Sequence, residues 1–554
     1  MLAKTHPGLH ALRHLRPASW SSTSNIIRSS HQQTRTLLQA SFDYKHIRDN
    51  AQRLLENAHS RNVRDAQPHR VGELYNEFRQ LTSQVNEYRS SLNNISKELG
   101  ALARGGKKHS QQKQHQHQHQ HQQQEKTQGN VDASGLDESG RAAVMADLHG
   151  RASIVKASIQ GLELQLGSIE ARLRYEAAKI PNLSHPDTPL GDESHARTVH
   201  INGNLHNTPT VPLDETNSAL SDVEFKDHYD LALSLGIVDM EAGARVAGSR
   251  FHYWRGAGAL LELALVQYAM TRAVAAGFVP HITPDVARSS VVDACGFRPR
   301  SGAEDALLDS QINGDSAAAV HGSGEASQIY RVMSVAEESH KEAAADPLCL
   351  VATAEIPLVA MRQQQILDRQ SLPISMAGLS HCFRAEAGAR GRDTRGIYRL
   401  HQFTKVELVT LALPENSQAE LTRLVDFQKS LYADLGLTFR LLQMPTYELG
   451  ASAYQKFDIE AWMPGRRAWG EISSASNCTD YQARRLGIRV RAESAKDGSG
   501  SPVFVHTLNA TAVAVPRIVV AMLESFQRPD GSVAVPHVLR PWMMGMDMLV
   551  PERC

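Results

Sequence analysis

The sequence predicts an α+β fold, in which an N-terminal antiparallel coiled-coil helical hairpin is followed by an antiparallel β-sheet flanked by helices. Two observations support this prediction: a pair of heptad repeats of equal length in the first third of the chain, and a strand–loop–strand pattern in the second half. The chain has 554 residues, of which 41 % are hydrophobic. That is enough to bury a large core and to form more than one domain.

The two heptad repeats have the pattern of coiled-coil helices, because apolar residues recur in each at alternating spacings of four and three. The first seam consists of Leu74, Phe78, Leu81, Val85, Tyr88, Leu92, Ile95 and Leu99, and the second of Leu148, Ala152, Val155, Ile159, Leu162, Leu166, Ile169 and Leu173. At a rise of 1.5 Å per residue each seam is about 38 Å long. Equal lengths and a single connection favour an antiparallel hairpin. Such a hairpin is either a structural or oligomerising coiled coil or a rod that reaches a partner.

The connection between the seams has a strongly biased composition. Residues 105–108 are Gly-Gly-Lys-Lys, and residues 111–124 are almost entirely histidine and glutamine. A tract without apolar residues has nothing to pack, so we expect a disordered insertion at the hairpin tip, over about residues 105–135. Its alternating histidines lack a fixed geometry, and we expect no functional metal site there. Lys107 and Lys108 are expected near the tip, where they could meet phosphate.

Charge and cysteine usage exclude several classes of protein. The chain has 59 basic and 59 acidic residues, so its net charge indicates no nucleic-acid partner, and any such surface must come from local basic clusters. Its five cysteines form no CxxC pair, which argues against a zinc knuckle or a disulfide scaffold and favours a reducing compartment. No apolar run reaches the roughly 18 residues that a membrane span requires, so we expect no membrane partner.

The first 40 residues have the composition of a mitochondrial transit peptide. They are rich in arginine and serine and contain no Asp or Glu. They also lack a long apolar segment, which disfavours secretion. We therefore expect residues 1–40 to be a transit peptide and the protein to be located in the mitochondrial matrix. The alternative is a disordered basic tail on a cytosolic protein.

The domain boundary is expected just after the second heptad repeat. The helical pattern ends near residues 180–182, and X-Pro pairs at residues 185–186 and 188–189 indicate a rigid, extended linker. The predicted domains are a transit peptide (1–40), a helical arm domain with the insertion (41–180), and a larger domain (181–554).

The larger domain contains a strand–loop–strand pattern rich in charge. Residues 380–386 have strand character, residues 388–396 form a glycine-rich loop with three arginines, and residues 398–410 resume strand character. This pattern predicts an antiparallel hairpin.

Side chains alternate along a strand, so the hairpin is expected to present its charged residues on one surface. Arg384 and Glu386 share one face of the first strand, and Phe403, Lys405 and Glu407 share one face of the second, so that all five can line one surface. A guanidinium binds phosphate or carboxylate bidentately, and an exposed aromatic ring stacks on a base. A carboxylate accepts hydrogen bonds from an ammonium or a hydroxyl. This set of groups suits a nucleotide together with an amino acid. The alternative is a polar solvent face with ordinary ion pairs.

The hairpin closely resembles motif 2 of the seryl-tRNA synthetases, which are class II aminoacyl-tRNA synthetases. The matching segments of motif 2 are residues 383–388, 391–396, 400–403 and 405–407. Residues 353–355 (Thr-Ala-Glu) resemble the serine-binding loop of the family, residues 471–485 its metal and ATP strand, residues 508–524 its motif 3, and residues 248–284 its motif 1 region.

The resemblance extends from about residue 43 to the end of the chain, and the coiled-coil arm is also a feature of the family. Ala510, Ala512 and Pro516 stand where some members have glycine or other small residues. The His/Gln tract and residues 301–345 have the character of insertions.

The resemblance implies a serine–tRNA ligase with a class II catalytic domain at 181–554 and a tRNA-binding arm at 41–180. It would activate serine with ATP to seryl-adenylate and transfer it to the 3′ end of mitochondrial tRNA-Ser. The implied partners are serine, ATP and tRNA-Ser, with Mg²⁺ as cofactor, and a second copy of the chain in a homodimer formed through motif 1. In the family the arm contacts the tRNA, and here its basic residues are Arg79, Arg89, Lys97 and Arg104.

The resemblance also implies roles for individual residues. Arg384 would bind the α-phosphate and the serine carboxylate, and Arg517 would reach the γ-phosphate; these are the expected catalytic residues. The implied serine-binding residues are Thr353, Glu355, Arg384, Glu407, Asn509 and Thr511. The implied ATP-binding residues are Arg384, Ala385, Glu386, Leu400, His401, Gln402, Phe403, Glu471, Ile472, Ser473, Ser474 and Arg517. The implied Mg²⁺ ligands are Glu471 and Ser474.

Physical chemistry makes these roles coherent. Attack of a carboxylate on the α-phosphorus of ATP requires alignment and charge neutralisation more than a protein nucleophile, so we expect no catalytic Ser, Cys or His. A site that hydrogen-bonds the substrate hydroxyl through Glu407 and Thr511 would reject alanine, because those groups would be left unpaired. Two other interpretations remain: a catalytically inactive relative that acts as a tRNA-binding or structural module, and a class II enzyme for another amino acid.

Overall fold

The computed structural model describes residues 42–112, 138–203, 225–297, 329–332, 346–386, 395–492 and 501–552. The predicted transit peptide, residues 113–135 of the predicted insertion and most of residues 301–345 lie outside the described residues. The chain divides into two compact units. The smaller consists of Asp43–Leu55 and Asp65–Ile180, and the larger includes Glu56–Arg64 and the chain from Pro181 onward.

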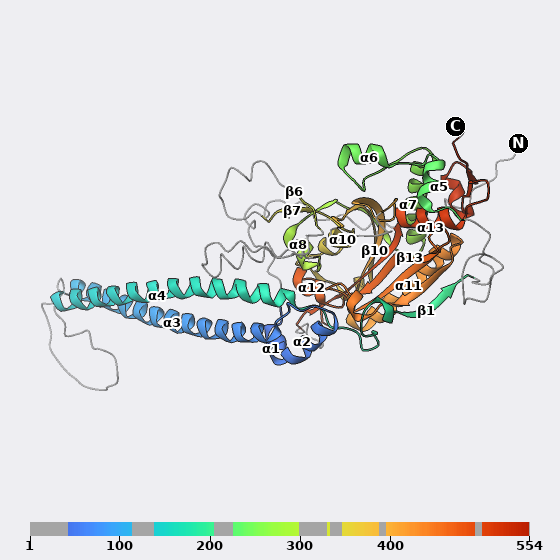
Figure 1. Ribbon diagram of the computed structural model, residues 1–554. Helices are drawn as coiled ribbons and strands as arrows, with labels where there is room; N and C mark the ends of the chain where they lie inside the picture. Colours follow the sequence, from blue (N-terminus) through green and yellow to red (C-terminus); the bar gives the residue numbers. More distant parts are fainter. Residues whose placement is uncertain are drawn as a thin grey trace. The chain divides into compact units, whose positions relative to one another are not determined.

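The smaller unit is a long helical hairpin. Helices α3 (Pro68–Gln112) and α4 (Glu138–Lys179) run side by side (Figure 1), and the short helix α1 (Tyr44–Asp49) packs against α3. Helix α2 (Ala51–Ser60) follows α1. Pro68 begins α3, a position where the missing N–H of proline leaves no helical hydrogen bond unmade. Helix α3 continues to Gln112, so residues 105–112 are helical rather than disordered.

The heptad seams form the contact between α3 and α4. Leu74 and Leu173 are almost completely buried, and so are Val85, Ile95 and Leu148. Tyr88 is the exception, with 40 % of its surface exposed. The predicted coiled-coil hairpin is thus confirmed.

The larger unit is built on an eight-stranded sheet in the described residues, with strand order β1-β11-β12-β13-β16-β10-β9-β4. The strands in this order are Arg197–Asn202, Phe439–Gln443, Gln455–Met463, Ala468–Asn477, His506–Ala514, Gln402–Ala412, Ile374–Phe383 and Val279–Ile282. Neighbouring strands are antiparallel, except that β4 runs parallel to β9. The predicted antiparallel sheet is confirmed.

Three helices flank the sheet: α7 (Ala257–Ala275), α11 (Ser417–Asp434) and α13 (Val515–Ser525). Shorter helices are α5 (His228–Ser234), α6 (Met240–Ala247), α8 (Ser289–Ala294), α10 (Glu355–Ala360) and α12 (Tyr481–Leu486). Short strands are β2 (Val238–Asp239), β3 (Tyr253–Trp254), β5 (Val286–Arg288), β6 (Arg331–Val332), β7 (Leu348–Leu350), β8 (Ile366–Leu367), β14 (Arg489–Val490), β15 (Val503–Phe504), β17 (Val533–Ala534) and β18 (Met548–Leu549). No helix within the described ranges has the length and apolarity to cross a bilayer.

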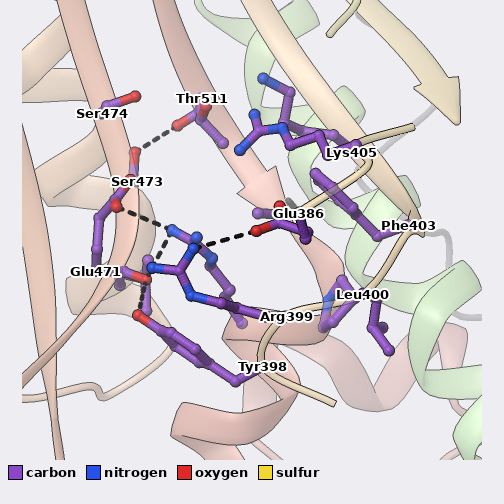
Figure 2. Close-up of a pocket in the computed structure, with 15 residues that line it drawn as sticks. Glu386, Tyr398, Arg399, Leu400, Phe403, Lys405, Glu471, Ser473, Ser474 and Thr511 are labelled. Carbon is purple, nitrogen blue, oxygen red and sulfur yellow. Dashed lines mark hydrogen bonds and ion pairs between the residues drawn. The ribbon is translucent and has the colours of Figure 1, made fainter. Parts of the chain in front are cut away.

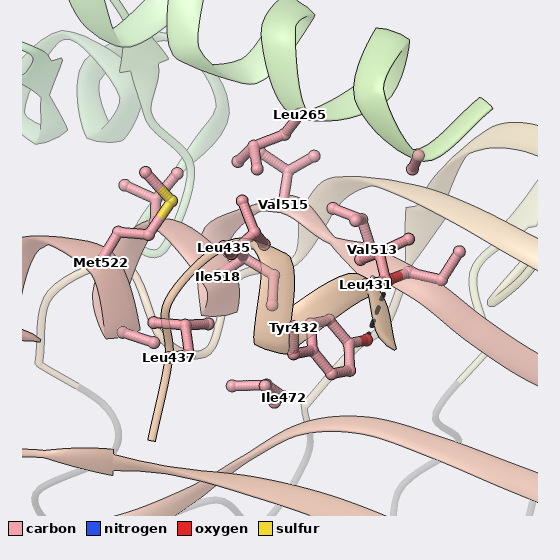
Figure 3. Close-up of a cluster of buried hydrophobic side chains, with 14 of the residues drawn as sticks. Leu265, Leu431, Tyr432, Leu435, Leu437, Ile472, Val513, Val515, Ile518 and Met522 are labelled. Atoms are coloured by element: carbon pink, nitrogen blue, oxygen red, sulfur yellow. Dashed lines mark hydrogen bonds between the residues drawn. The ribbon is translucent and has the colours of Figure 1, made fainter. Parts of the chain in front are cut away.

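The main core lies between the sheet and the three long helices. Figure 3 shows side chains from each layer meeting there, among them Leu265 of α7, Tyr432 of α11, Ile518 of α13 and Ile472 of β13. All four are buried, and burial of an aliphatic side chain of this size stabilises the fold by roughly 1.5–3 kcal/mol. The Tyr432 hydroxyl donates to the carbonyl of Ala512 at 2.9 Å, which ties α11 to β16.

Strand β10 separates this core from a polar surface. Val406 and Leu408 belong to the core under the helices, whereas Phe403, Lys405 and Glu407 point to the opposite face, as alternation predicts. The predicted hairpin of β9 and β10 is confirmed. Strand β9 ends at Phe383, however, so Arg384 and Glu386 follow the strand instead of sharing one of its faces.

A β-bulge in β13 changes the alternation of that strand. Ser473 pairs with Ile459 and Glu471 pairs with Glu460, so Ile472 is an extra residue on β13. In a regular strand Glu471 and Ser474 would point to opposite faces, because they are three residues apart. The bulge places both on the polar face and directs Ile472 into the core.

Candidate active site

A pocket opens on the polar face of the sheet, over β10, β13 and β16. Figure 2 shows its labelled residues converging from these strands and from the segment before β10. Its lining residues are Arg384, Glu386, Tyr398, Arg399, Leu400, Phe403, Lys405, Glu471, Ile472, Ser473, Ser474, Thr511, Ala514, Pro516 and Arg517. Ten of the residues predicted for ATP or serine therefore line one cavity.

An ion pair links the two sides of the pocket. The Nη1 atom of Arg517 lies 3.1 Å from Oε2 of Glu471 and also donates to the Glu471 carbonyl at 3.2 Å. The Tyr398 hydroxyl donates to the same carbonyl at 2.9 Å, and its ring lies under the guanidinium of Arg517. Burial alone would raise the pKa of Glu471, but Arg517, with smaller effects from Lys456 and Arg384, lowers it to about 2. Glu471 is therefore a charged acceptor at any physiological pH.

The opposite wall combines an aromatic ring with two more arginines. The guanidinium carbon of Arg384 lies 5.3 Å from the centre of the Phe403 ring, a cation–π contact. Arg399 donates to Glu386 at 3.2 Å. Glu386 has φ of 45°, a left-handed conformation that is uncommon outside glycine, and it turns the chain away from the strand. These contacts leave a half-buried aromatic face beside positive charge.

A buried trio lies deeper along β10 and β16. Lys405 and Glu407 form an ion pair at 2.6 Å, and the Thr511 hydroxyl donates to Oε2 of Glu407 at 3.0 Å. Each of the three side chains is at most about one-twentieth exposed. A buried charge is tolerated when it has partners, and here the Glu407 carboxylate is bound by Lys405 and Thr511. Lys405 was not among the predicted site residues, although its alternation with Phe403 and Glu407 on one strand indicated its position.

A second buried carboxylate, Glu355, lies at the start of α10. Its Oε1 accepts from the Asn509 amide at 2.9 Å and from the Gln482 amide at 2.7 Å, and its backbone N–H donates to Thr353 Oγ1 at 3.2 Å. Burial, reinforced by the charge of Glu407, raises the pKa of Glu355 to about 7, against the opposing effects of Gln482, Lys405 and Arg384. The electrostatic influence of Glu407, Lys405 and Arg384 places Glu355 beside the charged groups of the pocket.

Other predicted residues stand at the margin of the pocket or support it. His401 Nδ1 donates to the Arg384 carbonyl at 2.9 Å, and Gln402 pairs with Phe383 in the sheet, so these two shape the backbone of the site. Ser473 donates to the Thr511 carbonyl at 2.7 Å and thereby joins β13 to β16. Ala385, His401 and Gln402 do not line the cavity, and neither do Thr353, Glu355, Glu407 and Asn509.

Sequence reasoning missed Tyr398, Arg399 and Gln482. Tyr398 and Arg399 lie in the motif 2 hairpin, between the matched segments. Gln482 lies on α12, more than a hundred residues along the chain from Glu355, and no local pattern connects the two.

Comparison with known proteins agrees with this geometry. Residues 334–526 match the tRNA synthetase class II core domain (G, H, P, S and T), and residues 42–137 match the seryl-tRNA synthetase N-terminal domain. The serine–tRNA ligase of Rubrobacter xylanophilus is 40 % identical over 400 residues, which cover 72 % of this chain and 82 % of that protein. That of Treponema pallidum strain Nichols is 35 % identical over 516 residues, covering 92 % and 99 %.

Two solved structures share the architecture. The seryl-tRNA synthetase from Pyrococcus horikoshii, complexed with ATP, has a TM-score of 0.69 at 29 % identity and covers 92 % of this chain and 100 % of that one. The cytoplasmic serine–tRNA ligase from Naegleria fowleri, in complex with AMP, has a TM-score of 0.65 at 25 % identity and covers 93 % and 99 %. These matches mean that the chain belongs to the seryl-tRNA synthetase family and is a serine–tRNA ligase.

Proposed function

We propose that this pocket joins serine to ATP and that the resulting seryl-adenylate is then transferred to mitochondrial tRNA-Ser. The observation that carries the proposal is the position of Glu407. It is a buried carboxylate, bonded to Lys405 and Thr511, on the strand face that also holds Phe403. Such a set can grip a small hydroxyl-bearing amino acid next to a stacked nucleotide.

The residues divide the two substrates between them. Phe403 offers its ring to adenine, with Glu386 beside it, and Arg517 takes the γ-phosphate. Arg384 lies between the two substrates, where one guanidinium neutralises the α-phosphate and orients the serine carboxylate. The carboxylate oxygen attacks the α-phosphorus, the bond to the bridging oxygen breaks, and pyrophosphate leaves. The terminal ribose hydroxyl of tRNA then attacks the seryl carbonyl, and AMP leaves with the bonding electrons.

Serine is selected by paired polar groups. We assign Glu407 and Thr511 to the hydroxyl and Thr353 and Glu355 to the α-amino group, with Asn509 between the two sets and bonded to Glu355. Alanine leaves the first two groups without a substrate partner, and a pocket built around buried groups excludes the extra methyl of threonine by size.

The test is serine-dependent ATP–pyrophosphate exchange. Wild-type protein is expected to exchange with serine and not with alanine or threonine. Glu407→Ala is expected to lose the exchange, whereas Glu241→Ala, at an exposed glutamate on α6, should retain it. Near-normal exchange in Glu407→Ala would remove Glu407 from the serine site, and absence of wild-type exchange would support the inactive relative.

Mg²⁺ fits the groups at Glu471 and Ser474. The described residues contain no cluster of three or more His, Cys, Asp or Glu that could hold a metal by itself. Mg²⁺ is commonly held by one or two carboxylates together with substrate phosphates, and Glu471 is ionised with the Ser474 hydroxyl on the same face. When bound, the ion would neutralise phosphate charge. Glu471 and Ser474 would hold it, and Arg517 orients Glu471.

A homodimer is supported by exposed apolar residues on the motif 1 elements. Leu263 on α7 is 62 % exposed, and Val279 and Ile282 on β4 are 57 % and 85 % exposed. Strand β4 is an edge strand, and an open edge with exposed apolar side chains is typical of a surface that another chain covers. We expect a dimer in light scattering. Ile282→Asp with Leu263→Asp should give a monomer, and Leu190→Asp, at an equally exposed site elsewhere, should not. A dimer that survives the double substitution would argue against this face.

Recognition of tRNA is assigned to the arm. Arg79 and Lys97 are exposed on α3, whereas Arg89 is paired with Glu163 of α4 at 2.7 Å, and the Arg104 side chain lies outside the described residues. Deletion of residues 70–175 should spare adenylate formation and abolish charging. Arg79→Glu with Lys97→Glu should weaken charging and reduce its salt dependence, because phosphate contacts release counterions. Unchanged charging in the deletion would refute the role.

The mitochondrial assignment depends on residues 1–40. Their fusion to a fluorescent reporter is expected to direct the reporter to mitochondria. A fusion with the arginines of the segment replaced by glutamate is the control and should remain in the cytosol. A cytosolic wild-type fusion would favour the cytosolic alternative. Charging of mitochondrial tRNA-Ser by the purified protein tests the substrate directly.

A further inference from the structure

Glutamine 482 is buried next to the carboxylate proposed for the α-amino group of serine. It lies on α12 and is completely shielded from solvent. Thr507 on β16 is almost completely shielded too. Its Nε2 donates to Oε1 of Glu355 at 2.7 Å, the shortest contact made by that oxygen. A completely buried amide that faces a buried carboxylate restricts the positions that the carboxylate can take.

The orientation of the Gln482 amide is set by two further bonds. The Thr507 hydroxyl donates to its Oε1 at 2.6 Å, and its Nε2 also donates to the Cys295 carbonyl at 3.1 Å. If the amide were rotated by half a turn, its oxygen would face the Glu355 carboxylate and the Cys295 carbonyl, which are both acceptors. Four separate parts of the chain thus hold one carboxylate: Cys295 just after α8, α10 itself, α12 and β16.

One oxygen of Glu355 accepts both of the hydrogen bonds that reach its carboxylate. Asn509 and Gln482 both donate to Oε1, while no donor among the described residues is bonded to Oε2. Two donors on one oxygen fix the plane of the carboxylate and leave the other oxygen for a substrate donor. An ammonium group has three N–H donors and suits such an acceptor.

We propose that Gln482, locked by Thr507, is a positioning residue that holds the Glu355 carboxylate ready to receive the α-ammonium group of serine. The inference deepens the proposed function and rests on the serine site described there. Gln482 does not touch the substrate in this arrangement, and it acts through Glu355.

The charges around Glu355 explain why a donor is needed. The charges of Glu407 and Lys405 of β10 and of Arg384 after β9 act on Glu355, and the charge of Glu355 in turn acts on the buried thiols of Cys295 and Cys478. Burial and Glu407 raise the pKa of Glu355 to about 7, and the hydrogen bond from Gln482 acts in the opposite direction. Without that bond, a larger fraction of Glu355 would be neutral near pH 7, and a neutral acid is a poor acceptor for an ammonium group.

The test compares three variants in ATP–pyrophosphate exchange as a function of pH. Gln482→Met keeps the volume and removes all three hydrogen bonds of the amide, Thr507→Val removes only the bond from the Thr507 hydroxyl, and Thr507→Ser keeps that hydroxyl. Loss of a hydrogen bond to a charged group is worth roughly 1.5–3 kcal/mol, so Gln482→Met is expected to raise the serine KM about 10- to 100-fold. The ATP KM should stay within about two-fold, and the acidic limb of kcat/KM for serine should move to higher pH, because the ionised form of Glu355 has lost a donor.

Thr507→Val should show the same changes in smaller measure, and Thr507→Ser should restore wild-type values. Gln443→Met is the matched control. Gln443 is also a buried glutamine, it lies on β11 near the other edge of the sheet, and its amide donates to the Asp187 carbonyl. It should lower thermal stability without moving the serine KM. If Gln482→Met does not fold, Thr507→Val carries the test.

The outcomes separate this inference from the proposed function. Wild-type protein that shows no serine-dependent exchange would overturn the proposed function itself. Wild-type exchange together with an unchanged serine KM and an unchanged acidic limb in Gln482→Met and Thr507→Val would overturn the role of Gln482. A fall in kcat alone in both variants, as expected for a general structural defect, would overturn it too.

Discussion

The guanidinium of Arg517 and the carboxylate of Glu471 lie 3.1 Å apart, so the cation proposed for the γ-phosphate and the acid proposed for Mg²⁺ orient each other. Each group has a second tie to the pocket wall, because Tyr398 bonds to the Glu471 backbone and lies under the Arg517 guanidinium. Pairs held in this way reach a bound polyphosphate without rearrangement, which is the condition for electrostatic stabilisation of a transition state.

Glu471→Gln tests that relationship. The variant removes the negative charge that faces Arg517 and the proposed ligand of Mg²⁺, while it keeps the shape of the side chain. We expect ATP–pyrophosphate exchange to fall by roughly 10²- to 10³-fold, with a higher Mg²⁺ concentration needed for half-maximal rate. Exchange measured over a Mg²⁺ titration checks this. Glu241→Gln, at an exposed glutamate, is the control, and an unaltered Mg²⁺ dependence in Glu471→Gln would exclude Glu471 as a ligand.

Phe403→Ala is expected to weaken ATP binding selectively. The ring is half-buried beside Arg384, and stacking of a base on an aromatic ring is worth roughly 1–3 kcal/mol. The KM for ATP should therefore rise by about 5- to 150-fold, whereas the KM for serine should change little. Phe403→Tyr keeps the ring and should resemble the wild type. A Phe403→Ala variant with normal ATP affinity would show that adenine binds elsewhere.

Glu355→Gln is expected to stabilise the fold at alkaline pH. The pKa of Glu355 rises from 4.5 to about 7 on folding, so the folded state favours the neutral acid. The contribution of Glu355 to the free energy of unfolding is greatest below about pH 4.5 and is lost as the pH rises through about 7. The full loss is on the order of 3 kcal/mol. Glutamine cannot ionise and avoids that loss.

Thermal unfolding at pH 5 and pH 8 measures the effect. The melting temperature of Glu355→Gln, relative to wild type, should be higher at pH 8 than at pH 5, while serine-dependent exchange is lost. A difference between the two proteins that does not change with pH would contradict the raised pKa. The two results together would show a residue whose charge opposes folding and serves binding.

Leu173→Ala is expected to destabilise the helical hairpin without affecting the catalytic pocket. Leu173 is fully buried in the seam of α4, and removal of such a side chain typically costs 2–5 kcal/mol. Circular dichroism during thermal unfolding should report earlier loss of helix, and ATP–pyrophosphate exchange should remain. Leu164→Ala on the same helix is the matched control, since Leu164 is 79 % exposed. Equal effects of the two substitutions would show that the seam does not hold the hairpin.

Sequence patterns predicted those parts of the molecule that have a regular period. The spacing of Leu74 to Leu99 and of Leu148 to Leu173 was sufficient for the hairpin, because a heptad repeat buries one face of a helix. Alternation along β10 likewise placed Phe403 and Glu407 on one surface, since successive strand residues point to opposite sides.

Other parts of the site depend on contacts that no local pattern encodes. Arg384 and Glu386 were assigned to a strand, but the strand ends at Phe383 and Glu386 adopts a left-handed conformation. Gln482 reaches Glu355 from a distant helix, and such a pairing arises only when α10, α12 and β16 pack together. The roles of the individual site residues were implied by family resemblance and stay predictions until the variants are measured.

The extra residue Ile472 makes the length of β13 as important as its composition. Upstream of it Glu471 lines the pocket at the end proposed for phosphate, and downstream the strand leads to Ser476, which pairs with Asn509 at the end proposed for the amino acid. Removing one residue would turn every side chain on one side of the deletion to the opposite face of the sheet. Either the side chains proposed for the metal or those proposed for serine would then point into the core. The strand is therefore expected to tolerate the exchange of a side chain better than the gain or loss of a residue.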